Sequence, residues 1–217
     1  MKKLNIILCS IIILTLVITT ISLNILDDTI PIHFNIAGEP DLYGSKYFVL
    51  IFTSIVIIVA VIFLVLANSK KITDSYKKNL KVFSPLICVF FIILEVIFVA
   101  YAYSYNESEY LSFDFGKYIT LFIGIMAIVL GNILPKIEKN KTLGIRTKHS
   151  LYNEVTWFKT QRFGGYAICI YGFVLLITAV FFESLVCFIV LVSTLILTTL
   201  IVSIYSYKVY KIEKLKE

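Results

Sequence analysis

Six long apolar segments constrain this chain more than any other feature of its sequence. They cover residues 4–26, 47–67, 82–105, 118–134, 165–182 and 185–207. Each approaches or exceeds the length of about 20 residues that a helix needs to cross a hydrocarbon layer of about 30 Å. Lipid offers no hydrogen-bond partner, so each segment must satisfy its own backbone, and only a helix does so. We therefore expect an all-α, polytopic integral membrane protein with six transmembrane helices.

The composition excludes a soluble domain. Hydrophobic residues make up 59% of the 217 positions and charged residues 16%, against about 45–50% and about 25% in soluble domains. The apolar segments are rich in Ile, Val and Phe, which favour strands in water. A membrane β-barrel would alternate apolar and polar residues over about ten positions, and these segments do not alternate. The lipid bilayer is therefore the expected solvent for most of the chain.

The basic residues predict the orientation in the membrane. All of the 20 Lys and Arg residues except Lys46 and Lys117 fall on one side of a six-helix arrangement. The positive-inside rule makes this side cytoplasmic, so both termini are expected inside, N-in/C-in. The first apolar segment is too long for a cleavable signal, and we interpret it as a retained helix. The net charge of +6 reflects this topology and attraction to anionic lipids; it does not indicate direct nucleic acid binding.

The predicted outer loop, residues 27–46, is dense in turn-forming residues. Proline and glycine divide it into turns, and Asn and Asp side chains can bond nearby backbone groups. We expect an ordered loop that acts as a cap at the membrane interface or as an extracellular recognition surface. A metal site using His33, Glu39 and Asp41 has suitable residue types but no diagnostic spacing, so no metal or cofactor is assigned. The candidate recognition residues are His33, Asn35, Gly38, Glu39, Pro40, Asp41, Gly44 and Lys46.

The predicted inner loop, residues 131–165, combines basic residues with Gly, Asn and Trp. Pro135 should end the fourth helix, and Asn132 in its last turns needs a hydrogen-bond partner. Ser150 or Asn153 can cap a short amphipathic helix that leads to Arg162, with Val155, Trp157 and Phe158 at the membrane interface. Two glycines at 164 and 165 would then turn the chain into the fifth helix. The candidate recognition residues are Asn132, Pro135, Lys136, Gly144, Arg146, Thr147, Trp157, Arg162 and Gly165.

Glu95 is the ionisable residue inside the apolar segments, near the centre of the third. An ionised carboxylate at this depth costs a few kcal/mol or more, so the side chain should be protonated or paired within the bundle. One interpretation is structural, with the carboxyl group bonded to a hydroxyl or a carbonyl. The other is a functional site for a proton or a ligand.

Both loops resemble known protein families. The outer run Ile30-Pro-Ile-His-Phe-Asn35, followed by Gly38-Glu-Pro-Asp41 and Tyr43-Gly-Ser-Lys46, looks like the loop of a bacterial membrane domain of unknown function. The inner runs Gly131-Asn132, Pro135-Lys136, Gly144-Ile-Arg-Thr147 and Trp157-x-Lys-Thr-x-Arg-x-Gly-Gly165 are similar to the signature of the SdpI/YfhL family. The chain departs from that signature at Gln161-Arg162, where family members usually carry His-Arg, and at 148–150.

The resemblance implies an immunity function. Family members of this kind protect a Gram-positive cell from a secreted toxic peptide, the sporulation-delaying protein in the best-known system. In that best-known system the family member also sequesters a small transcriptional repressor at the cytoplasmic side of the membrane. The outer loop would then face the toxic peptide, and the inner loop would face the repressor. No catalytic residue is implied, so we do not expect an enzyme.

Two other classes of membrane protein remain as alternatives. A small-molecule or ion transporter would carry polar groups at the midplane and often internal repeats, and an intramembrane enzyme would need catalytic groups that converge at one depth. Neither pattern is visible in the sequence.

We divide the chain into a two-helix unit, residues 1–81, with the outer loop at 27–46, and a four-helix SdpI-like unit, residues 82–217, with the inner loop at 131–165.

Overall fold

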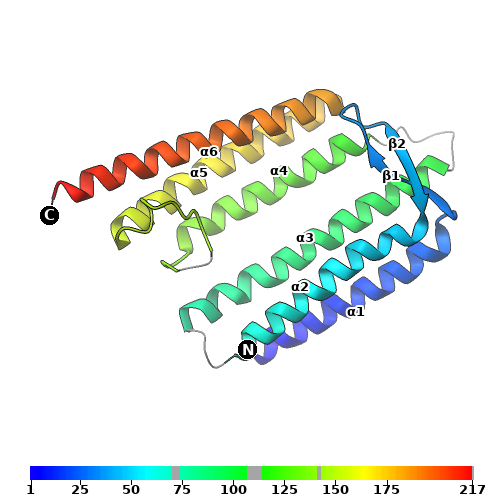
Figure 1. Cartoon of the computed structure of the whole chain (residues 1–217), viewed down its shortest axis with the longest axis horizontal. Coiled ribbons are helices and arrows are strands. Elements are labelled where there is room, and N and C mark those ends of the chain that lie inside the picture. Colours follow the sequence, from blue (N-terminus) through cyan, green and yellow to red (C-terminus); the bar gives the residue numbers. More distant parts are fainter. Residues whose placement is uncertain (70–73, 107–113, 141–142, 217) are drawn as a thin grey trace. The chain divides into compact units, whose positions relative to one another are not determined.

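The computed structural model describes residues 1–69, 74–106, 114–140 and 143–216. Its long helices are α1 (Lys2–Ile25), α2 (Leu50–Asn68), α3 (Asp74–Asn106), α4 (Phe115–Ile133), α5 (Glu154–Phe181) and α6 (Ser184–Lys214) (Figure 1). The shorter elements are strands β1 (Thr29–Phe34) and β2 (Pro40–Ser45) and 3-10 helices η1 (Lys46–Val49) and η2 (Leu134–Lys136). Six helices are long and apolar enough to cross a membrane. The predicted all-α, multi-pass fold is confirmed, and the N-in/C-in orientation stays a prediction.

The chain folds into two compact units, Met1–Phe115 and Gly116–Glu217. The first unit contains α1, α2 and α3, and the second contains nearly all of α4 together with α5 and α6. Our sequence-based boundary between residues 81 and 82 follows the motif regions rather than this packing. It stays a prediction about how the two motif regions are divided.

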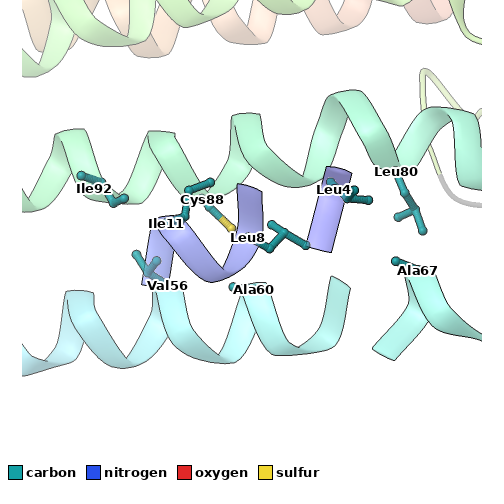
Figure 2. Packing of buried hydrophobic residues seen from close by; sticks show 9 residues of the cluster. All are labelled: Leu4, Leu8, Ile11, Val56, Ala60, Ala67, Leu80, Cys88 and Ile92. Carbon is teal, nitrogen blue, oxygen red and sulfur yellow. The ribbon is translucent and has the colours of Figure 1, made fainter. Parts of the chain in front are cut away.

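The core of the first unit forms where α1 packs against both α2 and α3. Figure 2 shows Leu8 and Ile11 of α1 among side chains of α2 and α3. The cluster consists of Leu4, Leu8, Ile11, Val56, Ala60, Ala67, Leu80, Cys88 and Ile92. The faces turned away from this core carry exposed aliphatic residues such as Ile13 and Val65. Such residues are stable against hydrocarbon, so the pattern fits a bundle dissolved in lipid.

A β-hairpin joins the C-terminal end of α1 to the N-terminal end of α2 and lies at that end of the first unit (Figure 1). Strands β1 and β2 are antiparallel, with Thr29 opposite Ser45 and Phe34 opposite Pro40, and the register shifts around His33. Ile30 is fully buried in a cluster with Leu26, Val49, Phe98, Val99 and Ala102. The sequence analysis expected turns here and did not anticipate the strands.

In the second unit, α4 and α5 approach each other through glycine. A Cβ atom added at Gly165 would lie 2.6 Å from the carbonyl oxygen of Gly131, and one added at Gly172 would lie 2.6 Å from the carbonyl oxygen of Gly124. Side chains at these positions would keep the two backbones apart. Small residues that allow close approach are a recurrent feature of helix packing in membranes.

Helix α5 is continuous, which corrects the expected short helix and turn. It begins at Glu154 after a capping box in which Asn153 and Thr156 bond each other's backbone N–H groups, as the predicted Asn153 cap requires. The helix then runs through Gly164 and Gly165 to Phe181. Both glycines are buried inside the helix, so they allow close packing and do not form a turn.

Candidate functional site

The tip of the hairpin is built by Asn35, Gly38 and Glu39. The Asn35 side-chain oxygen accepts from the N–H of Ala37 at 2.9 Å and from the N–H of Glu39 at 3.0 Å. Its amide group donates to a Glu39 carboxylate oxygen at 3.1 Å. Gly38 has a φ of 83°, a left-handed conformation that glycine adopts without strain. These candidate recognition residues therefore shape the turn.

The base and flank of the hairpin are held by two further contacts. The Lys46 ammonium lies 3.0 Å from an Asp28 carboxylate oxygen, and the Lys46 N–H donates to the Asp28 carbonyl at 3.1 Å. The hydroxyls of Tyr43 and Tyr105 are 2.6 Å apart, which ties β2 to α3. The hydrogen bond with Tyr105 raises the pKa of the Tyr43 hydroxyl above its usual value. The hairpin is fixed at its tip, base and flank.

His33 and Asp41 form the exposed polar surface of the hairpin. The Nδ1 atom of His33 lies 2.5 Å from Oδ1 of Asp41. Both side chains are open to solvent, at 64% and 44% of their surface. Gly44 has a packing role instead, because a Cβ atom at this position would lie 2.7 Å from the Ile32 side chain. Asn35 and Glu39 are exposed as well, but their polar groups hold the turn, whereas the contact of His33 with Asp41 joins only their two side chains.

Glu95 lies in a buried polar cluster between α1, α2 and α3. The Thr19 hydroxyl lies 2.9 Å from Glu95 Oε1, 2.7 Å from the Thr53 hydroxyl and 2.8 Å from the Thr15 carbonyl oxygen. Glu95 is fully buried, and its Oε2 atom has no hydrogen-bond partner within the described part of the chain. A contact with a hydroxyl, as the structural interpretation expects, is present, and the role of Glu95 stays a prediction.

The hydrogen count in this cluster decides which interactions can exist together. The Thr19 hydroxyl has one hydrogen and two lone pairs, yet it faces three oxygen atoms. It can donate to the Thr15 carbonyl while it accepts from Thr53 and from a protonated Glu95. An ionised Glu95 could accept from Thr19 and from Thr53, but the Thr19 hydroxyl would then lose its bond to the Thr15 carbonyl. The geometry therefore accommodates a neutral carboxyl group better than a carboxylate.

The inner loop is anchored on α5 by two side chains, Trp157 and Gln161, which we call the loop anchor. The Gln161 side chain accepts from the Ile145 N–H and donates to the Ile145 carbonyl, both at 2.9 Å. The Trp157 indole N–H donates to the Ile137 carbonyl at 2.8 Å. Trp157 is 2% exposed, so its side chain packs within the protein and does not face lipid headgroups; its depth in the membrane stays a prediction.

Thr147 and Ser150 complete the fold of the inner loop. Their side chains accept hydrogen bonds from each other's backbone N–H groups, both at 2.9 Å. Thr147 also contacts Ser206 of α6, with 2.7 Å between the hydroxyl oxygens. Gly144 has a φ of 96° and lies against Gln161. The Gly-Ile-Arg-Thr run is thus a closed turn held between α5 and α6.

Other inner candidates point outward. Arg146 is exposed, and its guanidinium has no ion-pair or hydrogen-bond partner within the described residues. Arg162 and Lys136 are also exposed. Asn132 was expected to be buried, but it is exposed and donates to the Ile128 carbonyl at 2.9 Å. Pro135 lies against Gly165, where it lines the close approach of the chain to α5.

Several structural residues were missed in the sequence analysis. Gln161 was noted only as a departure from the family pattern, although it is fully buried. Thr19 and Thr53 gave no signal because isolated threonines are common in transmembrane helices. The spacing of seven residues between Gly124 and Gly131, repeated by Gly165 and Gly172, was a signal that could have predicted the α4–α5 contact.

The described residues hold no group of three or more His, Cys, Asp or Glu side chains that could bind a metal. The three-ligand site considered for the outer loop therefore has no structural support, since Glu39 contacts Asn35 while His33 contacts Asp41.

Comparisons with known proteins agree with the two motif regions. Residues 136–206 match the SdpI/YfhL protein family, and residues 10–59 match a domain of unknown function, DUF1648. The chain is 27% identical over 213 residues to "Immunity protein SdpI" of Bacillus subtilis (strain 168), which covers 97% of both chains. No solved structure matches the chain. Both sequence resemblances are confirmed, and with the six apolar helices they identify a multi-pass cell membrane protein.

Proposed function

Because the chain carries an SdpI/YfhL family region and resembles an immunity protein over nearly its whole length, we propose that it protects its cell from a secreted toxic peptide. The observation that carries this proposal is the similarity over 97% of both chains, which spans both motif regions in one order. The similarity favours a role in binding over a role in catalysis. The proposed location is the cell membrane, with the hairpin outside.

The hairpin supports contact with the toxic peptide. Its turn and base are stabilised internally by Asn35 and Lys46, so the exposed side chains of His33 and Asp41 are held in fixed positions. Binding residues on a rigid scaffold lose little conformational entropy when a ligand arrives. We assign peptide contact to His33 and Asp41, and scaffold roles to Asn35, Gly38, Glu39, Pro40, Gly44 and Lys46.

The inner loop supports a second role, the sequestration of a small transcriptional repressor on the cytoplasmic side. Arg146 projects from a turn that the loop anchor holds closed. A guanidinium held by a rigid turn can bind a carboxylate or a phosphate with defined geometry. We assign partner contact to Arg146 with Lys136 and Arg162, and structural roles to Pro135, Gly144, Thr147, Trp157 and Gly165.

A transporter is the second candidate because Glu95 carries a buried oxygen atom without a partner in the described residues. Such a group inside a membrane often marks a proton or ion pathway. Proton or ion flux in vesicles that contain the purified protein would support this candidate. A reactive-probe screen for a nucleophilic side chain tests the remaining alternative, an intramembrane enzyme.

The test separates the two recognition surfaces. Asp41→Ala and Arg146→Ala are made singly, their membrane levels are matched, and survival under a secreted peptide toxin is measured together with reporter output from a linked repressor. We expect Asp41→Ala to impair protection and Arg146→Ala to impair signalling while protection remains. Glu154→Ala and Lys3→Ala remove the same charges elsewhere and should behave like the parent.

The proposal has a clear negative outcome. If the parent chain confers no survival on a sensitive cell at normal membrane levels, the immunity function is wrong. If protection is present but both variants equal the parent in both assays, the division between the two surfaces is wrong.

A further inference from the structure

We propose that the free edge of β2 binds a cationic, extended peptide by strand addition, so that the hairpin becomes a three-stranded sheet. The inference rests on the proposed function, because it names the class of toxic peptide and the way in which the hairpin holds it. In strand addition, backbone hydrogen bonds provide affinity and alternate side chains provide specificity.

The two strands of the hairpin differ in how far they are covered. In β1, Ile30 and Pro31 are buried although their side chains point to opposite faces. In β2, the three consecutive residues Asp41, Leu42 and Tyr43 are all exposed. Because successive side chains of a strand alternate between faces, β2 exposes side chains on both faces at this point, and only Tyr43 also contacts α3 through Tyr105 among the interactions described above. β1 is the covered strand, and β2 is the outer strand.

The backbone of β2 also has unused hydrogen-bonding groups. An antiparallel strand directs alternate N–H and C=O groups to each side, and β2 has β1 on one side only. Within the described residues, no backbone hydrogen bond joins residues 40–45 to any segment beyond β1. From Asp41 to Ser45 the strand contains no proline, so its outward N–H groups are available to a partner strand.

The charge of the hairpin selects a cationic partner. Residues 27–46 contain Asp27, Asp28, Glu39 and Asp41 against a single lysine, Lys46. Lys46 pairs with Asp28, which leaves three carboxylates that no lysine or arginine neutralises in this segment. Like charges on adjacent strands repel and opposite charges attract. A peptide strand rich in Lys or Arg therefore fits this edge, and an acidic strand does not.

Apolar side chains beside the edge suit a peptide that alternates basic and apolar residues. Ile36, Leu42 and Tyr47 are 62%, 55% and 60% exposed, and they lie at the tip, in the middle and just past the end of β2. The hairpin is also ordered before binding by the contacts of Asn35 and Lys46. An edge that carries a charge can also exist only to prevent aggregation, and the experiment distinguishes that role from binding.

The experiment uses the full chain in nanodiscs of phosphatidylcholine, with empty nanodiscs as the baseline. The probe is a blocked ten-residue peptide of alternating lysine and valine with a fluorescent label, and its binding is measured by anisotropy. A second probe carries N-methyl groups on every other residue, which removes the N–H groups of one edge. A third probe has glutamate in place of lysine. Carbonyl-labelled probes report extended pairing by isotope-edited infrared spectroscopy.

We expect the lysine probe to bind above the baseline and to show the infrared signature of a paired strand. The N-methylated probe should bind at least about tenfold more weakly, because each lost backbone hydrogen bond is worth roughly a few-fold in affinity. The double variant Asp27→Asn/Asp41→Asn should weaken binding of the lysine probe about two- to fivefold, as removal of exposed ion pairs does. The control Glu154→Gln removes a charge outside the hairpin and should leave the affinity unchanged.

Three results would overturn the inference: no binding of the lysine probe above empty nanodiscs, equal binding of the N-methylated probe, or equal binding of the glutamate probe. These results do not decide the immunity function, because survival under a secreted toxin is measured without the probe. Protection without strand addition would refute only the inference. Loss of protection with strand addition intact would refute the proposed function.

Discussion

Replacing Gln161 with leucine tests whether the loop anchor holds the inner loop closed. Leucine has a similar volume but no polar atoms, so both hydrogen bonds to Ile145 disappear. The Ile145 carbonyl still accepts from Ser150 at 2.9 Å. The Ile145 N–H has no such substitute and is left without a partner.

The expected cost follows from this difference between the two groups. An orphaned N–H group costs about 1–3 kcal/mol, and the second lost hydrogen bond costs about 1 kcal/mol. The sum of about 2–4 kcal/mol corresponds to a rise of roughly thirty- to several hundred-fold in the population of the open loop. Ile145 is only partly buried, so water can reach the opened groups and the lower end of this range applies.

Hydrogen exchange of the Thr147 and Ser150 amides provides the measurement, in nanodiscs and under conditions where exchange reports the opening equilibrium. Their own partners, the Ser150 and Thr147 side chains, are unchanged in the variant. Faster exchange therefore reports opening of the loop and not loss of the bond that was mutated. Gln161→His introduces the usual family residue, whose ring can replace at most one of the two bonds, and should give an intermediate rate.

Phe158→Leu changes an exposed neighbour on the same helix and serves as the matched control. It should leave the exchange of Thr147 and Ser150 as in the parent. If Gln161→Leu also leaves these amides unchanged, the inner loop is held by other contacts and the anchor role of Gln161 is refuted.

The orientation of the chain, the α4–α5 glycine contact and Glu95 can each be tested by substitution. Cysteine labelling in intact cells should modify Asn35→Cys and spare Lys148→Cys, because all but two of the 20 basic residues favour one side; labelling from outside at position 148 would reverse the orientation. Gly172→Ala should lower the unfolding free energy by about 1–3 kcal/mol through overpacking against the Gly124 carbonyl, measured in a reversible unfolding assay. The control Ile170→Ala changes an exposed residue of the same helix and should have a smaller effect. Glu95→Gln keeps the contact with Thr19 but cannot ionise, and its effect is measured as survival under the toxin across a range of pH. A pH dependence that differs from the parent would support a functional role for Glu95. Identical survival curves would leave Glu95 a structural residue.

The helices were predictable because lipid leaves one solution for a long apolar segment. Their number, their approximate positions and the cap at Asn153 could be derived from residue type and spacing alone. The start of the third helix was predicted less well. Helix α3 begins at Asp74, whereas the apolar segment begins at residue 82. Polar residues continue a helix beyond the membrane when the helix is already nucleated, and hydropathy does not record this extension.

The hairpin and the inner loop were only partly predictable. Pro31 and Pro40 suggested turns, although a proline at the end or the edge of a strand is compatible with pairing. Tryptophan is common at membrane interfaces, but residue type alone did not show that the Trp157 indole N–H donates to the Ile137 carbonyl inside the folded loop. The role of Gln161 depends on a partner 16 positions away, and no local pattern identifies such a pair.

The spacing of the glycine contacts between α4 and α5 restricts where the chain can change in length. The contacts recur after seven residues on each helix, at Gly124 and Gly131 and at Gly172 and Gly165. Two positions seven residues apart differ by only about 20° around an α-helix, so both glycines of each helix lie on the same face. Insertion of one residue between Gly124 and Gly131 would rotate one glycine away by about 100°, whereas an insertion in the loop between the helices would leave both crossings aligned. The chain can therefore vary in length between α4 and α5, but not between the paired glycines.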